Sequence, residues 1–406
     1  MQKHASCLLL LSSLFLAQEA QAHDPSCCQY ESMQSCPGSW SCSPCCSEQE
    51  CCCGEEISQM GETSTLPVYD LCCDCGVFVS VDFLYWYARE SNLTYAITYD
   101  FVPTGDGSNV TQVPKKYETF DTKWKPGVRV GLGMNLPCDG WDILAEWTYY
   151  KNSQKNSLSL PERSKPFFVG ELYFGTPWAR NETPATRRYN IANGEWKFRW
   201  NGLDLVMGRR YWLSPCFTLK PSVGIRGGWT KTNFDFVGLL TELQDPPDEV
   251  LNIDNTASFD NSFWGYGLLL GIDPAFYFTP CFSLYGGLDL SLLWGKSKLK
   301  EKHMEFASFT DTTTGAIQVV RNYNSSADSD VFSMQPILDL AIGLRYELKL
   351  CCDRYQIGVD VGWEHHVWLE HTMRHYQTDQ SPLTSGEENQ HDIEFGGFVL
   401  QARFDF

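Results

Sequence analysis

The residues of this chain best suited to covalent chemistry are its cysteines, which number 18 in 406 residues. So many thiols are typical of a protein exported to an oxidising compartment. Most of them crowd into residues 23–76, where apolar residues are too few to form a core. Disulfides, a metal site at Cys42-x-x-Cys45 or Cys72-x-x-Cys75, or free thiols could explain this segment. We favour disulfides and predict no metal site, because neither a repeat nor a histidine partner supports one.

Beyond this segment, the remaining cysteines fall in short polar turns between apolar stretches. We predict that these turn cysteines and the three that precede the first strand lie on one side of the membrane and form disulfides. The candidates are Cys72, Cys73, Cys75, Cys138, Cys216, Cys281, Cys351 and Cys352. A disulfide needs Cα atoms within about 7 Å, so a ring of turns cannot pair freely with itself. We expect the partners to be the N-terminal segment, other copies of this chain, or other cysteine-rich envelope proteins.

Histidines are the second candidate for chemistry. His365, His366, His371, His375 and His391 lie close in sequence to Glu364, Glu370 and Asp392, and histidine beside an acid can act as a general base. His371-x-x-x-His375 lacks the context of a zinc site, and no Gly-x-Ser-x-Gly turn occurs. We therefore predict no catalytic residue, no cofactor and no enzyme.

The elements that carry these residues alternate with period two. In Lys123–Lys151 the apolar row Val128, Val130, Leu132 and Met134 is followed by Pro137-Cys138-Asp139-Gly140. Trp141, Ile143, Ala145, Trp147 and Tyr149 then form a second apolar row. Period two indicates strands, and Pro with Asp-Gly indicates a tight turn. This stretch predicts a β-hairpin whose apolar face ends in aromatic residues, as in a membrane barrel with lipid outside and a polar lumen inside.

Similar rows predict ten strands from residue 77 to 406. Four short connections lie at Pro137–Gly140, Leu213–Phe217, Thr279–Cys281 and Cys351–Asp353, and they alternate with long polar ones at 99–122, 152–193, 237–262, 298–330 and 371–394. This alternation is typical of outer-membrane barrels. We predict an all-β, transmembrane, antiparallel up-and-down barrel of about 10 strands. Twelve is the alternative, if segments around 167–174 and 316–323 form a further strand pair; they could instead form loop hairpins. Trp196, Phe198 and Trp200 share a row, and the change of phase after Trp200 indicates a bulge.

Charged residues alternate with the apolar rows and would face the lumen. The predicted lumen-lining residues are Asp82, Arg129, Glu146, Asp204, Arg226, Asp289, Asp339, Arg345, Asp360, Glu364 and Arg403.

The N-terminus and the net charge define the compartment and the partners. An apolar run, Leu8–Leu16, precedes Ala20-Gln21-Ala22, which is typical of a secretory signal peptide. The predicted organisation is a signal peptide at 1–22, a cysteine-rich periplasmic segment at 23–76 and a barrel at 77–406, located in the cell outer membrane and in contact with its lipid. A net charge of −19 argues against nucleic-acid partners.

Three stretches resemble the Legionella-type pore-forming outer-membrane proteins, a family that includes major-outer-membrane-like proteins of environmental chlamydiae. They are Phe83–Glu90, Gly127–Gly133 leading to Asp139-Gly140-Trp141-Asp142, and Phe263–Leu268. The resemblance spans about residues 77–406 and implies a porin-like channel for small solutes. Disulfides would also link it to the cell envelope. The alternative is a structural or adhesive surface protein with a narrow or closed lumen, because ten strands leave little space between paired side chains.

Overall fold

The structure is a computed structural model that describes residues 76–91, 93–104, 109–136, 141–160, 172–175, 189–244, 249–350, 355–376 and 387–406. The predicted signal peptide and nearly all of the cysteine-rich segment lie outside these ranges. No helix in the described part is long and apolar enough to cross a membrane. The strands found there are β1 Val77–Glu90, β2 Thr94–Thr104, β3 Asn109–Thr119, β4 Trp124–Asn135, β5 Trp141–Ser159, β6 Leu172–Gly175, β7 Ile191–Arg209, β8 Tyr211–Ser214, β9 Phe217–Gln244, β10 Glu249–Tyr277, β11 Phe282–Asp311, β12 Ile317–Leu350, β13 Tyr355–Tyr376 and β14 Glu387–Asp405.

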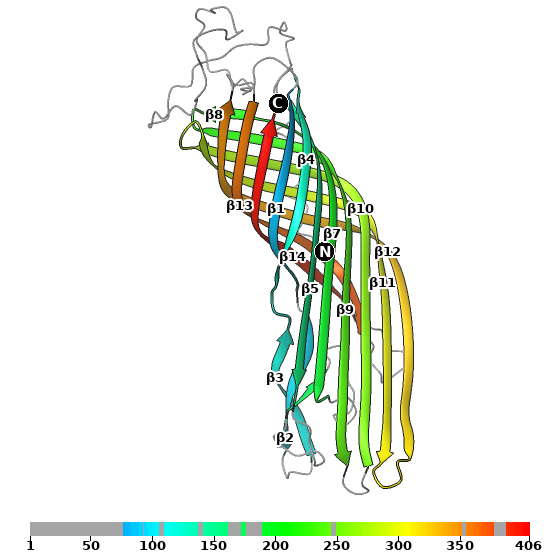
Figure 1. Cartoon of the computed structure of the whole chain (residues 1–406). Helices are drawn as coiled ribbons and strands as arrows, with labels where there is room; N and C mark the ends of the chain where they lie inside the picture. The colour runs from blue at the N-terminus through cyan, green and yellow to red at the C-terminus, as the bar shows by residue number, and fades with distance from the viewer. Residues whose placement is uncertain are drawn as a thin grey trace, which may run out of the picture.

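Ten of these strands form an antiparallel ring (Figure 1). The order is β1-β4-β5-β7-β9-β10-β11-β12-β13-β14, and β14 pairs again with β1. The first strand of the ring and the C-terminus meet at this seam, where Val77 and Phe406 exchange two backbone hydrogen bonds at 3.0 and 2.9 Å. The ring has the ten strands that the alternating rows predict.

The strands are much longer than predicted on one side of the ring. β9 and β10 run through most of 237–262, and β11 and β12 run through most of 298–330. The prediction of long loops in these two ranges is wrong. Polar residues with scattered apolar ones still form strands there, because strands paired on a neighbour need an apolar residue only on the face that is buried.

The smaller strands lie outside the ring order. β2 pairs with β3 and β6 to form a three-stranded sheet, and the short β8 pairs with the start of β9. The alternative of twelve strands required segments 167–174 and 316–323 to pair. Instead, β6 pairs with β2, while Ile317 and Val319 continue β12 against β11. That pairing is therefore wrong.

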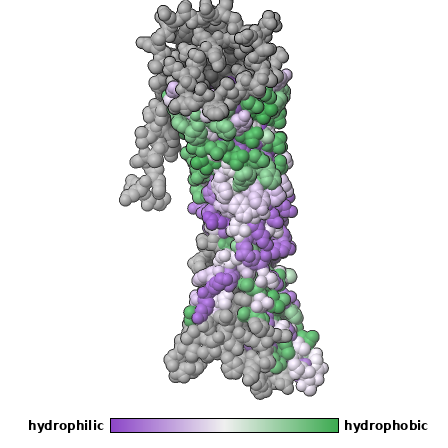
Figure 2. Space-filling model, turned by 60° about the vertical axis from the view of Figure 1, so that its left-hand side comes forward, coloured by the Kyte–Doolittle hydropathy of each residue, from purple (hydrophilic) through white to green (hydrophobic). Residues whose placement is uncertain are grey.

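The outer surface of the ring divides into two zones. Near the short turns every strand exposes an apolar row, for example Leu203, Leu205 and Met207 on β7, and Val223 and Ile225 on β9. Further along, the same strands expose Lys197, Arg199 and Lys231 at least in part. Figure 2 shows this change as a hydrophobic band followed by a hydrophilic zone. Exposed Trp147, Trp229, Trp264 and Trp294 lie towards the far border of the band.

The inner surface changes in the opposite sense. On β7, Asp204 faces inward beside the apolar band, whereas Trp196, Phe198 and Trp200 face inward beyond it, and all three rings are almost fully buried. The described pairings of β7 with β5 and β9 have no register shift. The predicted bulge after Trp200 is therefore wrong. The phase of the apolar pattern changes because the apolar residues move from the outer to the inner face.

Candidate functional site

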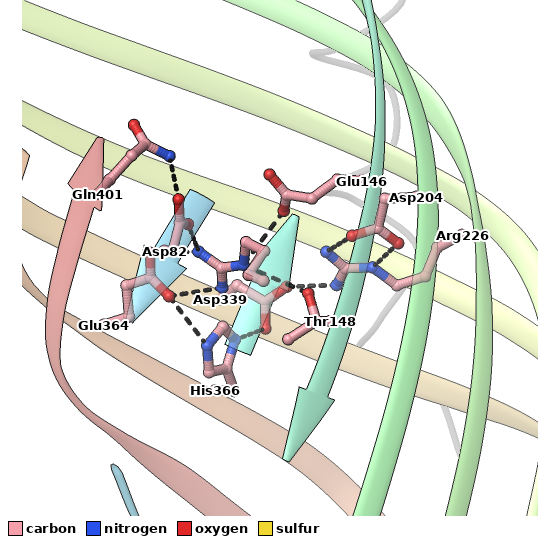
Figure 3. Close-up of polar contacts among 10 residues, drawn as sticks. Asp82, Glu146, Thr148, Asp204, Arg226, Asp339, Glu364, His366 and Gln401 are labelled. Atoms are coloured by element: carbon pink, nitrogen blue, oxygen red, sulfur yellow. Dashed lines mark hydrogen bonds and ion pairs between the residues drawn. The ribbon is translucent and has the colours of Figure 1, made fainter. Parts of the chain in front are cut away.

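The interior of the ring beside the apolar band is occupied by ion pairs (Figure 3). The first group centres on Arg129 of β4. Its Nη1 and Nη2 atoms donate to the two carboxylate oxygens of Glu364 at 2.8 and 2.7 Å. The same guanidinium lies 3.2 Å from Asp82 and 3.2 Å from Glu146. One arginine thus contacts three carboxylates from β1, β5 and β13, which is possible because its five N–H donors spread in a plane.

A second group centres on Arg226 of β9. Its Nε and Nη2 atoms donate to the two oxygens of Asp204 at 2.9 Å each, and Nη1 bonds Asp339 across the lumen on β12. His366 connects the two groups, because its Nδ1 lies 2.7 Å from Asp339 and its Nε2 lies 3.5 Å from Glu364. These contacts join seven of the ten ring strands.

Further pairs lie towards the short turns. Arg345 forms a forked pair with Asp360 at 2.7 to 3.0 Å. Arg403 forms another with Asp405 at 2.5 to 3.0 Å. The side chain of Gln401 donates to Asp82 at 2.9 Å. These arginines are therefore held by carboxylates of the same strand, of a neighbouring strand or of a strand across the lumen.

The structure brings the predicted lumen residues together. A cavity of about 270 Å³ lies among the ion pairs, and ten of the eleven line it: Arg129, Glu146, Asp204, Arg226, Asp289, Asp339, Arg345, Asp360, Glu364 and Arg403. Asp82 is buried in contact with Arg129. Their part in conduction stays a prediction.

A layer of aromatic rings lies in the interior on the far side of the ion pairs. Trp200 of β7 and Phe395 of β14 lie 5.0 Å apart between ring centroids, although three strands separate β7 from β14 around the ring. Trp86 lies 6.1 Å from Trp200, 5.8 Å from Phe395 and 4.8 Å from His366. Tyr150 also stacks on Phe395. Trp86 and Phe395 have no exposed surface, so these rings pack on one another across the interior between β7 and β14.

The aromatic layer continues outward as a packed core. Phe234, Phe259, Phe263 and Trp368 are buried there, and the guanidinium of Arg374 lies 5.1 Å from the centroid of Phe234, another contact across the lumen. This layer was not among the predicted features. A signal was present, because Leu84 and Trp86 share the inward phase of Asp82 on β1.

A buried polar cluster lies within this core. Glu90 has a fully buried side chain and accepts hydrogen bonds from Trp196 Nε1 at 2.9 Å, from Thr372 at 2.8 Å and from Arg374 at 2.5 Å. This cluster fixes β1 against β7 and β13.

The histidines do not form one group. His365 contacts Tyr87 on the outer face at 3.3 Å, whereas His366 belongs to the ion pairs. His371 is buried between Thr230 at 2.6 Å and Gln335 at 2.8 Å. His391 is also buried, and the side chain of His375 lies outside what the structure describes.

Among the predicted disulfide candidates, Cys216 and Cys281 are disulfide-bonded. Both lie at the short-turn end, where the Cys216 carbonyl accepts from Tyr277 N–H and the Cys281 carbonyl accepts from Glu347 N–H. Both cysteines are bonded within the chain, and a cysteine bonded in this way does not link two molecules. Cys72, Cys73, Cys75, Cys138, Cys351 and Cys352 lie outside the described residues.

Comparison with known proteins identifies the family. A model of one family, described as the Legionella pneumophila major outer membrane protein precursor, matches residues 72–406. The chain belongs to this family. This confirms the resemblance found in the sequence and the predicted location in the outer membrane. No curated protein matches the chain in sequence.

Solved structures of outer-membrane proteins are similar to this family member at low identity. The outer membrane protease OmpT from Escherichia coli has 11% identity and a TM-score of 0.31, covering 83% of this chain and 99% of its own. A Pseudomonas aeruginosa FadL homologue has 9% identity and a TM-score of 0.27, with 82% and 90% covered. The P. putida toluene transporter TodX has 10% identity and a TM-score of 0.28, with the same coverage.

Proposed function

We propose that this protein is a closed outer-membrane barrel with a structural or adhesive role at the cell surface, and that it is neither an open channel nor an enzyme. The observation that carries the proposal is the contact between Trp200 and Phe395 at 5.0 Å across the lumen. A porin-like channel for small solutes, which the family resemblance implies, would need this contact to separate.

The energetic argument is the burial of the aromatic layer. Removing one buried Trp or Phe side chain from a packed core costs about 3–5 kcal/mol, and Trp86, Trp200, Tyr150 and Phe395 pack on one another. Opening a path for solutes would expose several of them together. Below them, the ion pairs of Arg129 and Arg226 would also have to rearrange, and breaking a buried pair costs about 3–5 kcal/mol.

The extended outer end favours a surface role. β9, β10, β11 and β12 are 28, 29, 30 and 34 residues long, whereas a barrel strand needs only about 9–11 residues to cross a bilayer. The remaining residues form a sheet that stands beyond the apolar band. Its outer face exposes lysines such as Lys231 together with apolar residues such as Met304 and Phe306. An architecture of this kind presents surface area outside the membrane.

Conductance across planar bilayers tests the proposal. We expect the refolded full chain to insert without ion conductance. The variant Trp86→Ala/Trp200→Ala/Phe395→Ala removes one of the layers that fill the interior and should give brief channel openings, because the ion pairs remain. Tyr85→Ala on the outer face should stay silent as the matched control. A heat-modifiable band on gels verifies folding of each variant. Stable channels formed by the unmodified protein would overturn the closed barrel and restore the porin.

The second part of the proposal concerns the envelope. Cys138, Cys351, Cys352 and the N-terminal cysteines would link the barrel to other copies or to other cysteine-rich envelope proteins, since the outer membrane faces an oxidising compartment. Non-reducing gels of whole envelopes should show high-mass species that reductant collapses to monomer. Replacing Cys138, Cys351 and Cys352 by serine should deplete these species, whereas Cys216→Ser/Cys281→Ser should not. A protein that is monomeric without reductant would contradict this role.

A further inference from the structure

Three cations lie side by side on the outer face where the apolar band ends. Lys151 of β5 is the register partner of Arg199 of β7, and Arg199 is the register partner of Lys231 of β9. Their side chains are exposed. Directly opposed residues have Cβ atoms only about 4.5–5.5 Å apart. Lys151, Arg199 and Lys231, called here the basic row, therefore concentrate positive charge on a protein whose net charge is −19.

The position of the basic row relative to the membrane follows from the strand register. Two residues closer to the short turns, on the same outer face, the register partners are Tyr149, Asn201 and Trp229. Trp264 of β10 pairs with Trp229. Aromatic rings of this kind lie at the level of the lipid headgroups. Two residues along a strand tilted by roughly 40° rise about 5 Å. The cations therefore lie at the height of the headgroup phosphates, on the side away from the short turns. Since short turns are periplasmic, this is the outer leaflet.

The basic row has few carboxylate partners. Lys231 lies 2.8 Å from Asp260, but Lys151 and Arg199 form no ion pair within the described part of the chain. On β1, which β4 separates from β5 in the ring, Arg89 is also the first outward charge beyond the aromatic Tyr87. Glu394 binds it through two hydrogen bonds at 2.8 and 2.5 Å. Like charges placed opposite each other destabilise a sheet, so an external anion would stabilise the basic row by balancing this repulsion. Arg89 needs no such anion, because Glu394 already balances its charge.

We propose that the basic row, with its adjoining Tyr and Trp residues, is a binding site for the phosphate groups of an outer-leaflet glycolipid of the lipid A type. The lipid chains would lie against the apolar rows of β5, β7 and β9. The phosphates would accept hydrogen bonds from Arg199, Lys151 and Lys231, since a guanidinium binds phosphate in a fork and an ammonium binds it as a point charge. Lys298 flanks the site, because Ser262 is the register partner of both Lys231 and Lys298.

Native mass spectrometry of the refolded full chain in uncharged detergent tests the site. The probes are bisphosphorylated lipid A, dephosphorylated lipid A, phosphatidylglycerol and inorganic phosphate. Each cation near an anionic lipid contributes about fivefold in affinity. We expect bisphosphorylated lipid A to bind at least tenfold more tightly than the dephosphorylated form. The variant Lys151→Gln/Arg199→Gln should weaken it about 25-fold, and the matched control Arg89→Gln should change it less than twofold.

Every other outcome counts against the proposal. Equal binding of dephosphorylated lipid A would mean that the acyl chains alone are recognised. Equal binding of phosphatidylglycerol would remove the preference for the outer leaflet, and saturation by millimolar inorganic phosphate would reduce the site to a free-anion site. If Arg89→Gln weakened binding as much as the double variant, the basic row would not be the site. The unfolding midpoint of each variant in urea shows that it is folded.

Discussion

The membrane-crossing part of the ring and its outer extension have opposite polarity, although the same strands build both. In the crossing part, β9 exposes Val223 and Ile225 and buries Arg226. In the extension, it exposes Lys231 and buries Phe234 and Phe236. This difference shows that the period-two pattern of a strand determines only which residues share a face. The solvent around each part decides which face is apolar, because lipid surrounds one part and water the other.

Inside the crossing part, removing Arg129 should have the largest effect on stability. Arg129→Met leaves Asp82, Glu146 and Glu364 buried without their cation, and breaking a buried ion network costs about 3–5 kcal/mol. Arg89→Met removes an exposed pair on the outer face of β1 and β14 and should cost less than about 1 kcal/mol. Urea unfolding in detergent measures both values. Equal costs would show that the interior charges are hydrated like the surface ones.

On the outer faces, the same substitution should have different costs in the two parts. Ile225→Arg places a charge against lipid near mid-bilayer and should cost about 2–4 kcal/mol in bilayers. Asn233→Arg makes the same charge on the same face of β9 beyond the band, where we expect a change within about 0.5 kcal/mol. Refolding into vesicles and unfolding with urea gives both numbers. A similar cost at the two sites would mean that the band ends elsewhere.

The strand count and the inward charges were predictable because each rests on period two within a short stretch. Asp82, Arg129 and Glu364 had to share one side of the wall once their strands were placed. Contacts across the lumen were not predictable in this way. Trp200 meets Phe395 only because the ring closes at a diameter that brings β7 and β14 together, and no local pattern carries that distance.

The outer extension was missed for a related reason. The residues of 298–330, such as Lys298, Lys300 and Asn322, are polar enough to be taken for a loop. They form strands because β11 and β12 continue to satisfy each other's backbone groups after the lipid has ended. The change of phase after Trp200 has the same cause. The apolar residues of β7 face lipid on the outside in one part and the packed interior in the other, so the pattern changes phase without a bulge.

The buried core of the extension should make stability depend on pH. Burial lowers the pKa of His371 to about 3, beyond the last outward apolar residue of β13, Leu369. The unfolded chain has a pKa near 6.5 at this position, so it binds the proton first, and stability is lost as the pH falls from 6.5 towards 3. Between pH 6.5 and pH 5 the expected loss is about 2 kcal/mol.

The variant His371→Gln isolates this contribution. It keeps a polar side chain between Thr230 and Gln335 but cannot take up a proton. Urea unfolding at pH 6.5 and pH 5 should therefore show a loss smaller by about 2 kcal/mol in the variant than in the unmodified protein. Identical losses in the two proteins would assign the pH dependence to other groups, and the core around His371 would then be accessible to water.

The smallest expected effect concerns the border between the two parts, where the basic row meets the aromatic residues. In uncharged detergent no phosphate balances Lys151, Arg199 and Lys231, so Arg199→Gln removes two like-charge contacts and should stabilise the barrel by about 0.2–1 kcal/mol. Arg89→Gln, which removes a cation paired with Glu394, should have the opposite sign. At 1 M salt the screening length falls to about 3 Å, and the changes in stability of both variants should shrink towards zero.

Urea unfolding at low and high salt separates these electrostatic effects from packing. If Arg199→Gln destabilised the protein equally at both salt concentrations, the arginine would act through its packed stem, and the basic row would not be under electrostatic repulsion.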